Sequence, residues 1–304
     1  MNFTKYLDQS IPKFYGGGNG SKKAIKLDDQ IYMLKFPPQE KKKQIYTNSC
    51  ISEYIACHIF SSLGFNTQET ILGTATYKDK EKVVVACKDF TSIGVRLQEF
   101  AEIKNGCLDS SNNGYGTELE GVLDAIHDQE IVSPQKLEEF FWDMFITDAL
   151  LGNFDRHNGN WGFLINDYTS EVMIAPIYDC GSCLYPQMDE TVMRMVMSNE
   201  DELLNRIYVF PNSALKINGN KINYHFFINS FESEECNKAL LRIYSKIDMN
   251  EISRIIDDTP YISNLQKDFY KTSIGKRYEL ILTPAFEQLK IMREVQNHTV
   301  QMKL

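Results

Sequence analysis

Near the middle of the chain, residues 152–160 read Gly-Asn-Phe-Asp-Arg-His-Asn-Gly-Asn. They place one carboxylate, one imidazole and three carboxamides in a segment that two glycines leave free to bend. Carboxylate and amide oxygens are ligands that a magnesium ion prefers in proteins. We therefore expect these residues to form a loop that holds a divalent metal and a phosphate chain beside a general base.

The segments on both sides of this loop predict how it is held. Apolar residues at helical spacing follow the N-cap residue Ser133 and a first-turn proline up to about residue 151, and Gly152 ends the helix. Short strands expected at 161–165 and 171–174 form a hairpin that leads to a second carboxylate, Asp179. A core helix therefore aims the loop, and the hairpin brings Asp179 after it.

A small antiparallel sheet with one helix is predicted before residue 90. Lys35 lies in its second strand and Glu53 on its helix. Each has a simple structural alternative, because a lysine can reach solvent from a sheet edge and a glutamate on a helix is normally solvated. An ion pair between them is the more specific hypothesis. The expected strands are 24–27, 31–36, 70–77 and 82–87, and the helix is 49–63.

The segment before this sheet, residues 16–20, has glycine at four of its five positions. Such a backbone can bend around a ligand and expose N–H groups to it, although a flexible surface turn fits the same composition. It is not a Walker A loop, because it lacks the Gly-Lys-Ser/Thr ending and a strand follows it instead of a helix.

The rest of the chain is predicted to be mainly helical. We therefore divide the chain into a sheet-containing lobe, residues 1–90, and a helical lobe, residues 91–304. Asn218 and Gly219 predict a local hairpin. Pro284 is expected to kink or restart the last helix. The helices expected after the central hairpin are 200–208, 224–230, 234–247, 249–256, 262–269 and one from about 276, and a short helix is expected earlier, at 118–127.

Composition excludes several classes of function. The net charge of −9 argues against general binding to a nucleic-acid backbone and leaves only a local basic groove open. There is no signal-peptide core near Met1 and no run of about 18 apolar residues that could span a bilayer. We expect a cytoplasmic protein without a membrane span, with export by a route that needs no cleaved signal as the alternative.

The cysteines and histidines do not predict a structural metal site. The seven cysteines are odd in number and scattered, which favours reduced thiols over a disulfide framework. Cys180 and Cys183 form the one close pair, for which a redox or metal role remains an alternative. The histidines form no cluster, which argues against a metal phosphoesterase.

Three oxygen-bearing side chains follow a meaningful spacing. Asn160 comes five residues after Asp155, and Asp179 comes 24 residues after it, across the hairpin and two residues before Gly181. A protein-kinase catalytic loop has the same order, Asp-x-x-x-x-Asn and then Asp-x-Gly. A glycine-rich segment, a strand lysine, a helix glutamate and a connector precede it here in the order that such an enzyme uses to hold ATP.

The pattern Asn153-x-Asp155-x-His157-x-x-Asn160, followed by Ala-Pro-Ile-Tyr-Asp at 175–179, resembles the HipA-like serine/threonine kinases. The resemblance extends from the glycine-rich segment to about residue 290. It implies an α+β, two-lobed protein-kinase-like fold, with a small antiparallel sheet and one helix in the first lobe and a mainly helical second lobe. Here the metal-binding tripeptide is Asp-Cys-Gly and has no phenylalanine.

The resemblance also implies a role for each matching residue. Asp155 would be the catalytic base, and Asn160 and Asp179 the magnesium ligands. Lys35 would bind phosphate and Glu53 would hold it. The remaining implied residues are Gly18, Asn19 and Gly20 in the loop that covers the phosphates, Cys87 and Asp89 in the connector beside adenine, where backbone groups matter most, and His157, which we expect to brace the loop rather than carry a proton.

The implied activity is transfer of the γ-phosphoryl group of ATP, with Mg²⁺, to serine or threonine hydroxyls of a protein substrate. The alternative is a catalytically weak, nucleotide-binding, toxin-like module that acts by binding a partner such as an antitoxin or a host protein. No direct contact with nucleic acid is expected. Loss of Asp155, Asn160 or Asp179 would favour the alternative, and all three are present.

Overall fold

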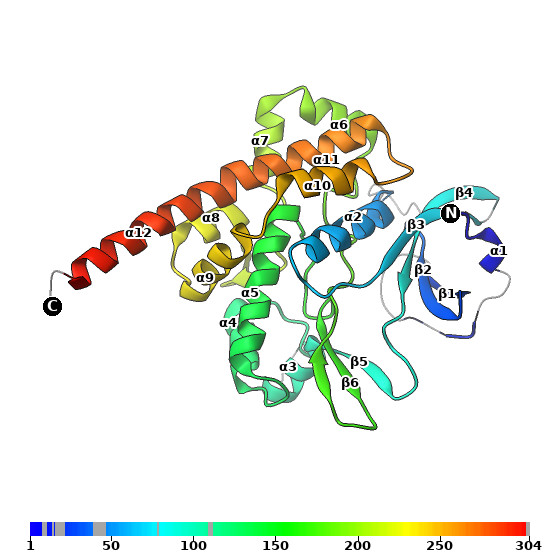
Figure 1. The fold of residues 1–304 in the computed structure, drawn as a ribbon, viewed down its shortest axis with the longest axis horizontal. Coiled ribbons are helices and arrows are strands. Elements are labelled where there is room, and N and C mark those ends of the chain that lie inside the picture. Colours follow the sequence, from blue (N-terminus) through cyan, green and yellow to red (C-terminus); the bar gives the residue numbers. More distant parts are fainter. Residues whose placement is uncertain are drawn as a thin grey trace.

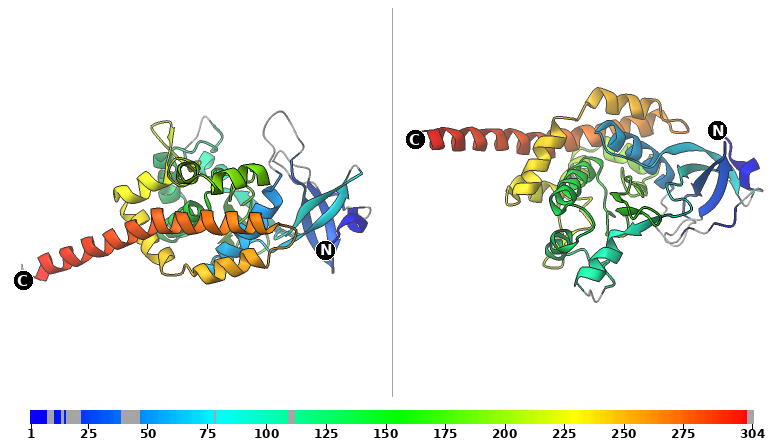
Figure 2. Two further views of the ribbon diagram at one scale, coloured as in Figure 1. Left: turned by 90° about the horizontal axis from the view of Figure 1, so that it is seen from above. Right: turned by 60° about the horizontal axis from the view of Figure 1, so that its bottom comes forward.

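The computed structural model describes residues 1–7, 11–13, 15, 22–38, 47–77, 79–108 and 112–301, with side chains up to 295. An antiparallel sheet near the N-terminus stands beside a larger group of helices, and the C-terminal helix α12 projects away from both (Figures 1 and 2). This is the mixed, two-part architecture that the sequence predicts.

The N-terminal sheet has the strand order β1-β2-β4-β3 and is antiparallel throughout. Its first hairpin turns at Asp28 and Asp29, whose φ angles of 43° and 65° match the left-handed turn that two-residue hairpins favour. Register pairs Lys22 with Lys35 and Leu27 with Gln30. The strands are β1 (Lys22–Leu27), β2 (Gln30–Lys35), β3 (Thr70–Tyr77) and β4 (Lys80–Lys88), close to the expected bounds.

Helix α2 (Ser49–Ser62) covers one face of this sheet and also contacts helix α10 of the helical part. Its stripe includes Ile55 and Ile59, both fully buried, and Gly64 ends the helix with a φ of 91°. A single helical turn, α1 (Thr4–Leu7), follows Phe3, which packs on the opposite face of the sheet. Because α2 is packed on both sides, it can hold a polar side chain in a fixed position.

A second sheet, with strand order β5-β6-β7, lies under the helices. Its strands are β5 (Val95–Glu99), β6 (Gly162–Asn166) and β7 (Val172–Ile174). Strand β5 and the following helix α3 (Phe100–Leu108) were not predicted, because β5 is short and finds its partner β6 more than sixty residues away. The boundary proposed at residue 90 falls in the connection between β4 and β5.

Helix α5 is the centre of the helical part and contacts α4, α9 and α11. Its N-cap Ser133 accepts a hydrogen bond from the Lys136 N–H, and Gly152 ends it in the left-handed conformation, as expected. The helices are α4 (Leu119–Asp128), α5 (Pro134–Leu151), α6 (Glu190–Met197), α7 (Glu200–Tyr208), α8 (Tyr224–Ser230), α9 (Glu234–Tyr244), α10 (Met249–Asp257), α11 (Asn264–Arg277) and α12 (Thr283–Gln301), and a small hairpin joins β8 (Lys216–Ile217) to β9 (Asn220–Lys221).

Two expectations for the C-terminal helices are wrong. Helix α6 was missed, and the break expected between residues 269 and 276 does not exist, because α11 continues to Arg277. One π-helical turn, Tyr278–Leu282, then joins α11 to α12. Pro284 lies just after this turn. Proline lacks an N–H and crowds the preceding turn of a regular helix, and the wider turn accommodates it without ending the helix.

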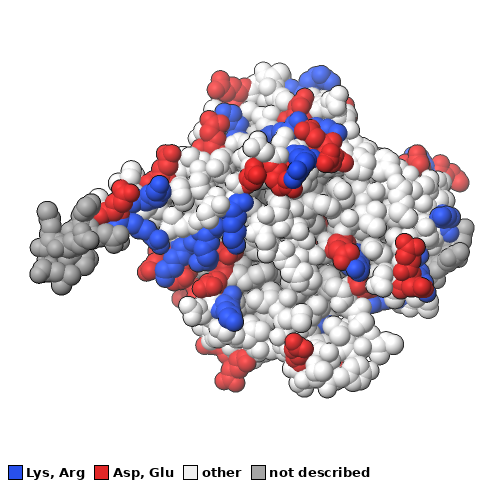
Figure 3. Space-filling view, viewed as in Figure 1, with Lys and Arg blue, Asp and Glu red and all other residues white. Residues whose placement is uncertain are grey.

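No helix in the described part of the chain is both long and apolar enough to span a membrane. Basic side chains on the face drawn in Figure 3 mostly lie next to acidic ones, consistent with the net charge of −9. All seven cysteines are free, as expected.

Candidate active site

A cleft of about 1170 Å³ lies between the N-terminal sheet and the helical part. Strands β1 and β2, helix α2, the connector after β4, the loop 152–160 and the segment around Asp179 all contribute to its wall. Ligand sites in proteins typically occupy about 300–1,000 Å³. The cleft therefore has room for a nucleotide and an acceptor side chain together.

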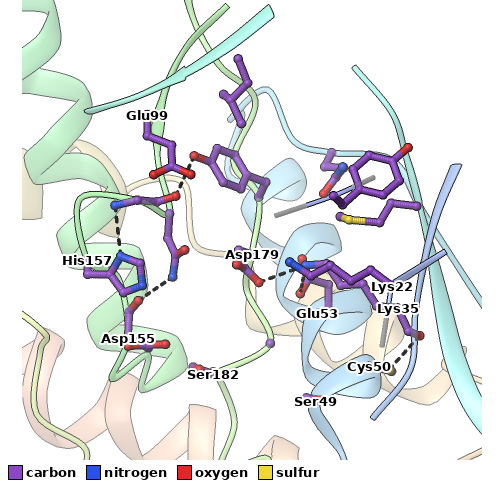
Figure 4. A pocket seen from close by; sticks show the side chains of 18 of the residues that line it. Lys22, Lys35, Ser49, Cys50, Glu53, Glu99, Asp155, His157, Asp179 and Ser182 are labelled. Atoms are coloured by element: carbon purple, nitrogen blue, oxygen red, sulfur yellow. Dashed lines mark hydrogen bonds and ion pairs between the residues drawn. The ribbon is translucent and has the colours of Figure 1, made fainter. Parts of the chain in front are cut away.

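Lys35, Glu53 and Asp179 meet at one end of this cleft (Figure 4). Lys35 Nζ lies 3.0 Å from Glu53 Oε2 and 3.0 Å from Asp179 Oδ1. The exposed fractions of these side chains are 12% for Lys35, 2% for Glu53 and 40% for Asp179, so the aspartate is the member that faces the open cleft. The ion pair between Lys35 and Glu53 is therefore present in the structure.

The contacts among Lys35, Glu53 and Asp179 shift the pKa values of all three groups. Burial acts to lower the pKa of Lys35, but the carboxylates of Asp179 and Glu53 outweigh it and hold that pKa well above the ordinary value. The positive charge of Lys35 lowers the pKa of Asp179 to about 2. Burial raises the pKa of Glu53, against the effect of Lys35. At neutral pH the cleft therefore presents an ammonium and an ionised Asp179 side by side.

Close packing around residue 181, two positions after Asp179, favours a glycine there. A Cβ atom at this position would lie 3.2 Å from Glu53 Oε2 and 3.3 Å from the Ser49 carbonyl oxygen. Glycine thus allows the segment to approach helix α2. Asp179 itself has a φ of 54°, a left-handed conformation that aspartate tolerates better than most residues.

Asp155 lies at the mouth of the cleft and is exposed to solvent. Hydrogen bonds to the backbone of Asp155 hold the loop in place. Its N–H donates to Asn153 Oδ1 at 3.0 Å, and its carbonyl oxygen accepts from Asn160 Nδ2 at 2.8 Å. Although Asp155 is exposed at the mouth of the cleft, the surrounding protein atoms displace part of the water around its carboxylate and raise its pKa; His157 opposes this, and the negative charge of Asp179 adds to it. The carboxylate is therefore more basic than an ordinary aspartate.

Asn160 and Asp179 offer one carboxamide oxygen and one carboxylate to the same cleft. Because Asn160 Nδ2 donates to the Asp155 carbonyl, its Oδ1 is the atom left for a ligand. No cluster of three or more His, Cys, Asp or Glu side chains that could hold a metal occurs among the described residues. This set fits Mg²⁺, which typically takes one or two protein oxygens and completes its shell with phosphate and water.

His157 is hydrogen-bonded within the loop at two positions. Its ring Nδ1 accepts a hydrogen bond from the Gly159 N–H at 3.0 Å, and its backbone N–H donates to the Asp155 carbonyl oxygen at 2.8 Å. The Tyr115 ring meets the imidazole edge to face, with centroids 6.3 Å apart. Tyr115 also donates to Glu99 Oε2 at 2.7 Å. The bracing role expected for His157 stays a prediction.

Arg156 is a site residue that sequence reasoning missed. Its guanidinium pairs with Asp148 on α5 and donates to the carbonyl oxygens of Asn160 and Tyr178, at 3.0 and 2.7 Å. It also lies 3.3 Å from Cys180 Sγ. The signal in the sequence was an acidic residue, Asp148, inside the apolar stripe of the helix that leads to the loop.

The connector beside the cleft differs in detail from the expectation. Cys87 lies inside β4, paired with β2 and β3, and its side chain is fully buried and does not line the cleft. The residues after β4 that line the cleft are Asp89, Phe90 and Thr91. No local signal in the sequence shows that β4 continues through Cys87 to Lys88 before the connector begins.

The Asp89 carboxylate is hydrogen-bonded to other side chains of the protein. Its carboxylate accepts hydrogen bonds from Lys13 and Tyr15, both at 2.6 Å, and from Thr91, and its N–H donates to the Ile31 carbonyl at 2.8 Å. Burial acts to raise the pKa of Asp89, but the hydrogen bonds outweigh it and the pKa is lowered. Asp89 thus anchors the chain just before the glycine-rich segment. Gly18, Asn19 and Gly20 lie outside the described residues.

The fold and the cleft define the class of this protein as a protein kinase: a small sheet with its helix and a helical part enclose a lysine, a glutamate and an Asp-x-Gly segment opposite an Asp-x-x-x-x-Asn loop. The chain belongs to the family described as HipA-like C-terminal domain, whose model matches residues 14–258. The resemblance and the kinase assignment inferred from the sequence are thereby confirmed.

Comparison with individual proteins agrees with the family. The chain is 50% identical over 288 residues to the serine/threonine-protein kinase CtkA of Helicobacter pylori, covering 94% of this chain and 87% of the relative. The crystal structure of the Helicobacter pylori proinflammatory kinase CtkA matches with a TM-score of 0.89 and 48% identity, over 96% of this chain and 98% of that one.

A more distant structure shares the fold alone. Shewanella oneidensis HipA, solved with HipB and its operator DNA, matches with a TM-score of 0.54 and 16% identity. The match covers 91% of this chain and 67% of that chain. The two-part architecture is therefore common to compact and larger members.

Proposed function

We propose that this kinase uses the cleft to transfer the γ-phosphoryl group of ATP, with Mg²⁺, to a serine or threonine hydroxyl of a protein substrate. The observation that carries the proposal is the meeting of Lys35, Glu53 and Asp179 at 3.0 Å contacts in a cleft whose other wall holds Asp155 and Asn160. Residues from four separate parts of the chain supply the groups that phosphoryl transfer needs.

Asp155 orients the acceptor hydroxyl and accepts its proton. The hydroxyl oxygen forms a bond to the γ-phosphorus while the bond from that phosphorus to the β–γ bridging oxygen breaks, and ADP leaves. The carboxylate suits this task because its raised pKa makes it a better proton acceptor than an ordinary aspartate. No lysine or arginine side chain in the described part of the chain forms an ion pair with Asp155, which leaves its oxygens for the hydroxyl.

Lys35 binds the phosphate chain and stays charged while it does so. Glu53 holds the ammonium from the side of helix α2, so the side chain keeps its direction when a ligand competes for Asp179. Two carboxylates around one ammonium explain why the charge survives burial. The lysine therefore stabilises negative charge on the phosphate oxygens.

Asn160 Oδ1 and the Asp179 carboxylate would hold Mg²⁺ at the phosphate end of the cleft. The ion, when bound, neutralises phosphate oxygens and orients the γ-phosphoryl group. His157 keeps the loop in shape through its bond from the Gly159 N–H. Asp89 fixes the chain before Gly18, Asn19 and Gly20, which we assign to the loop that covers the phosphates.

The experiment that tests this proposal replaces Asp155 by Asn and measures phosphate transfer from labelled ATP to a general protein substrate. General-base catalysis contributes about 10²- to 10⁴-fold, so a loss of that size is expected. ATP affinity, measured by calorimetry, should stay within about twofold, because Asp155 lies at the mouth and not among the phosphate-binding groups. An unchanged transfer rate would exclude Asp155 as the base.

A further inference from the structure

Asn48 lies where three parts of the chain meet: the start of helix α2, the segment 186–188 and the start of helix α11. Its backbone N–H donates to the Pro186 carbonyl oxygen at 3.1 Å, and its side-chain Nδ2 donates to the Met188 carbonyl oxygen at 2.6 Å. Its Oδ1 accepts from Gln266 Nε2 at 3.4 Å. The residue is buried. These contacts join helix α2, which packs on the N-terminal sheet, to the helical part.

The side chain of Asn48 is not used to cap its own helix. Asn48 is the N-cap residue of α2, and an asparagine at this position usually accepts a hydrogen bond from an N–H of the first helical turn. In the described structure its side chain makes no such bond. The carboxamide instead contacts residues that come 140 and 218 positions later in the chain. Its contacts therefore set where the helix lies and do little for the helix itself.

The partners of Asn48 allow one orientation of its carboxamide. A carbonyl oxygen only accepts hydrogen bonds, so the group that faces Met188 is Nδ2. Oδ1 then faces Gln266, whose own orientation is set because its Oε1 accepts from the Ser263 N–H at 3.0 Å. Each of these groups thus has a partner of the right kind, and the junction is directional.

The segment that accepts these bonds is held to the helical part. Leu184 and Tyr185 have φ angles of 57° and 56°, a left-handed conformation that bulky residues adopt only where their surroundings impose it. The Leu184 N–H donates to the Leu151 carbonyl oxygen at the end of α5, at 3.0 Å, and the Tyr185 hydroxyl donates to the Arg206 carbonyl oxygen. The carbonyl groups that follow are therefore fixed acceptors for Asn48.

Two residues of the active site lie close to this junction along the chain. Glu53 follows Asn48 by five positions on α2, and Asp179 precedes Pro186 by seven positions. The start of α2 also approaches the Asp179 segment directly, because a Cβ atom at residue 181 would lie 3.3 Å from the Ser49 carbonyl oxygen. A shift of the first turns of α2 would therefore move Glu53 relative to Asp179.

Apolar packing alone does not fix these first turns. Helix α2 packs on β3, β4 and α10 through buried apolar side chains such as Ile55 and Ile59. Burial of apolar surface is non-directional, so it holds the helix on the sheet without setting its exact position along its axis. Hydrogen bonds to two fixed carbonyl oxygens supply that direction.

We infer that Asn48 is a positioning residue, which fixes helix α2 against the segment after Asp179 so that Glu53 holds Lys35 in the direction that phosphate binding requires. The inference rests on the proposed function, in which Lys35 contacts the phosphates. Asn48 does not itself line the cleft, so it acts through Glu53. Without the junction, α2 keeps its apolar packing, but its first turns shift and the ammonium loses its fixed direction.

Asn48→Ser separates the position of α2 from its stability. Serine is about as good an N-cap residue as asparagine, so the helix itself should form normally. Serine lacks the carboxamide that reaches Met188 and Gln266, so the contacts between the two parts are lost. The matched control is Asn229→Ala on α8, because Asn229 Nδ2 also donates to a distant carbonyl oxygen, that of Ile281 at 3.3 Å, and does not line the cleft.

The test measures Mg-ATP binding by calorimetry for the full chain, for Asn48→Ser, Glu53→Gln and their double variant, and for Asn229→Ala. We expect Asn48→Ser to weaken ATP binding about 5- to 10-fold, the loss that one or two hydrogen bonds produce. In the Glu53→Gln background the same replacement should change the affinity less than about twofold, because its effect passes through Glu53. Asn229→Ala should bind ATP like the parent.

Two results would overturn the inference. One is an ATP affinity of Asn48→Ser equal to that of Asn229→Ala. The other is an equal loss from Asn48→Ser with and without Glu53, which would show that Asn48 acts on the fold in general and not through this residue. Neither result depends on turnover, so both are separate from failure of the proposed function, which the Asp155→Asn transfer assay detects.

Discussion

The guanidinium of Arg156 and the carboxylate of Asp148 form a buried, two-point ion pair. Arg156 Nε lies 3.0 Å from Asp148 Oδ2, and Nη2 lies 3.2 Å from Oδ1. The exposed fractions of the two side chains are 5% and 1%. Nη1 donates to the carbonyl oxygens of Asn160 and Tyr178, so one side chain connects helix α5, the loop of Asp155 and the segment that ends at Asp179.

This pair predicts a large effect of Asp148→Ala on stability. Removing one partner of a buried pair leaves the other charge unpaired and costs about 3–5 kcal/mol. Urea unfolding measures the free energy of unfolding. The matched control is Asp143→Ala on the same helix, which loses a more exposed pair with Arg242 and should cost about 1 kcal/mol or less. Equal losses in the two variants would contradict the special role of Arg156.

Glu53→Gln should separate nucleotide binding from proton transfer. The amide keeps the shape of the side chain but removes one of the two carboxylates that hold Lys35 at 3.0 Å. We expect the KM for ATP to rise about 10-fold, because the lysine loses its fixed direction. Steady-state kinetics at varied ATP measure this effect. Asp155→Asn should show the opposite pattern, with kcat lowered and KM little changed, and the same pattern in both variants would speak against the division of roles.

Removal of divalent metal should abolish transfer, and Asp179→Asn should raise the magnesium concentration that half-restores it by about 10-fold. Asparagine is the suitable replacement because it tolerates the left-handed φ of 54° found at this residue. Titration of activity with Mg²⁺ after chelation gives the half-restoring concentration. A variant with the parent's magnesium dependence would remove Asp179 from the proposed ligand set.

We expect the phenol of Tyr115 to lose its proton at a higher pH than an ordinary tyrosine. Its hydrogen bond to Glu99, followed by burial, raises the pKa of its phenol to about 12, from the ordinary value of about 10. Because the folded pKa is the higher one, the contact stabilises the fold fully below pH about 10, and this stabilisation disappears as pH rises through about 12. Glu99→Gln should lower the pKa of one tyrosine, seen in a pH titration of phenolate absorption. The shift should be absent when Tyr115→Phe is already present.

Gly162→Ala should destabilise the second sheet. A Cβ atom there would lie 2.2 Å from the Gln98 carbonyl oxygen on β5, which is backbone and cannot move aside. Overpacking of this kind costs about 1–3 kcal/mol. Gly275→Ala is the control, because nothing lies within 4 Å of its Cβ position in helix α11, and alanine there should add up to about 1 kcal/mol. Thermal unfolding of both variants compares the two effects.

Much of the fold could be read from local patterns. The first hairpin, helix α2, the start of α5 at Ser133 and its end at Gly152 were predicted close to their bounds, because turn and cap chemistry acts over a few residues. Strand β5 was missed because its pairing partner is remote in sequence. The continuous path from α11 to α12 was missed because a π-helical turn accommodates Pro284 in a way that no local rule shows.

The sequence likewise predicted only part of the candidate site. The order Asp155, Asn160, Asp179 could be read from spacing, since a short loop and a hairpin keep these residues near each other. Arg156 was overlooked because its partners, a helix carboxylate and two carbonyl oxygens, are set by packing. Cys87 was placed in the connector because the sequence does not mark where β4 ends.

The amino-acid sequence by itself determined the loop, its polar side chains, the helix that leads in and the hairpin that leads out. These depend on backbone preferences and on contacts between near neighbours. Only the tertiary structure decided that Lys35 meets Glu53, 18 residues away, and Asp179, 144 residues away. Such meetings depend on how α2 packs between the sheet and the helices, and burial of apolar surface drives that packing without leaving a periodic signal in the polar residues that it brings together.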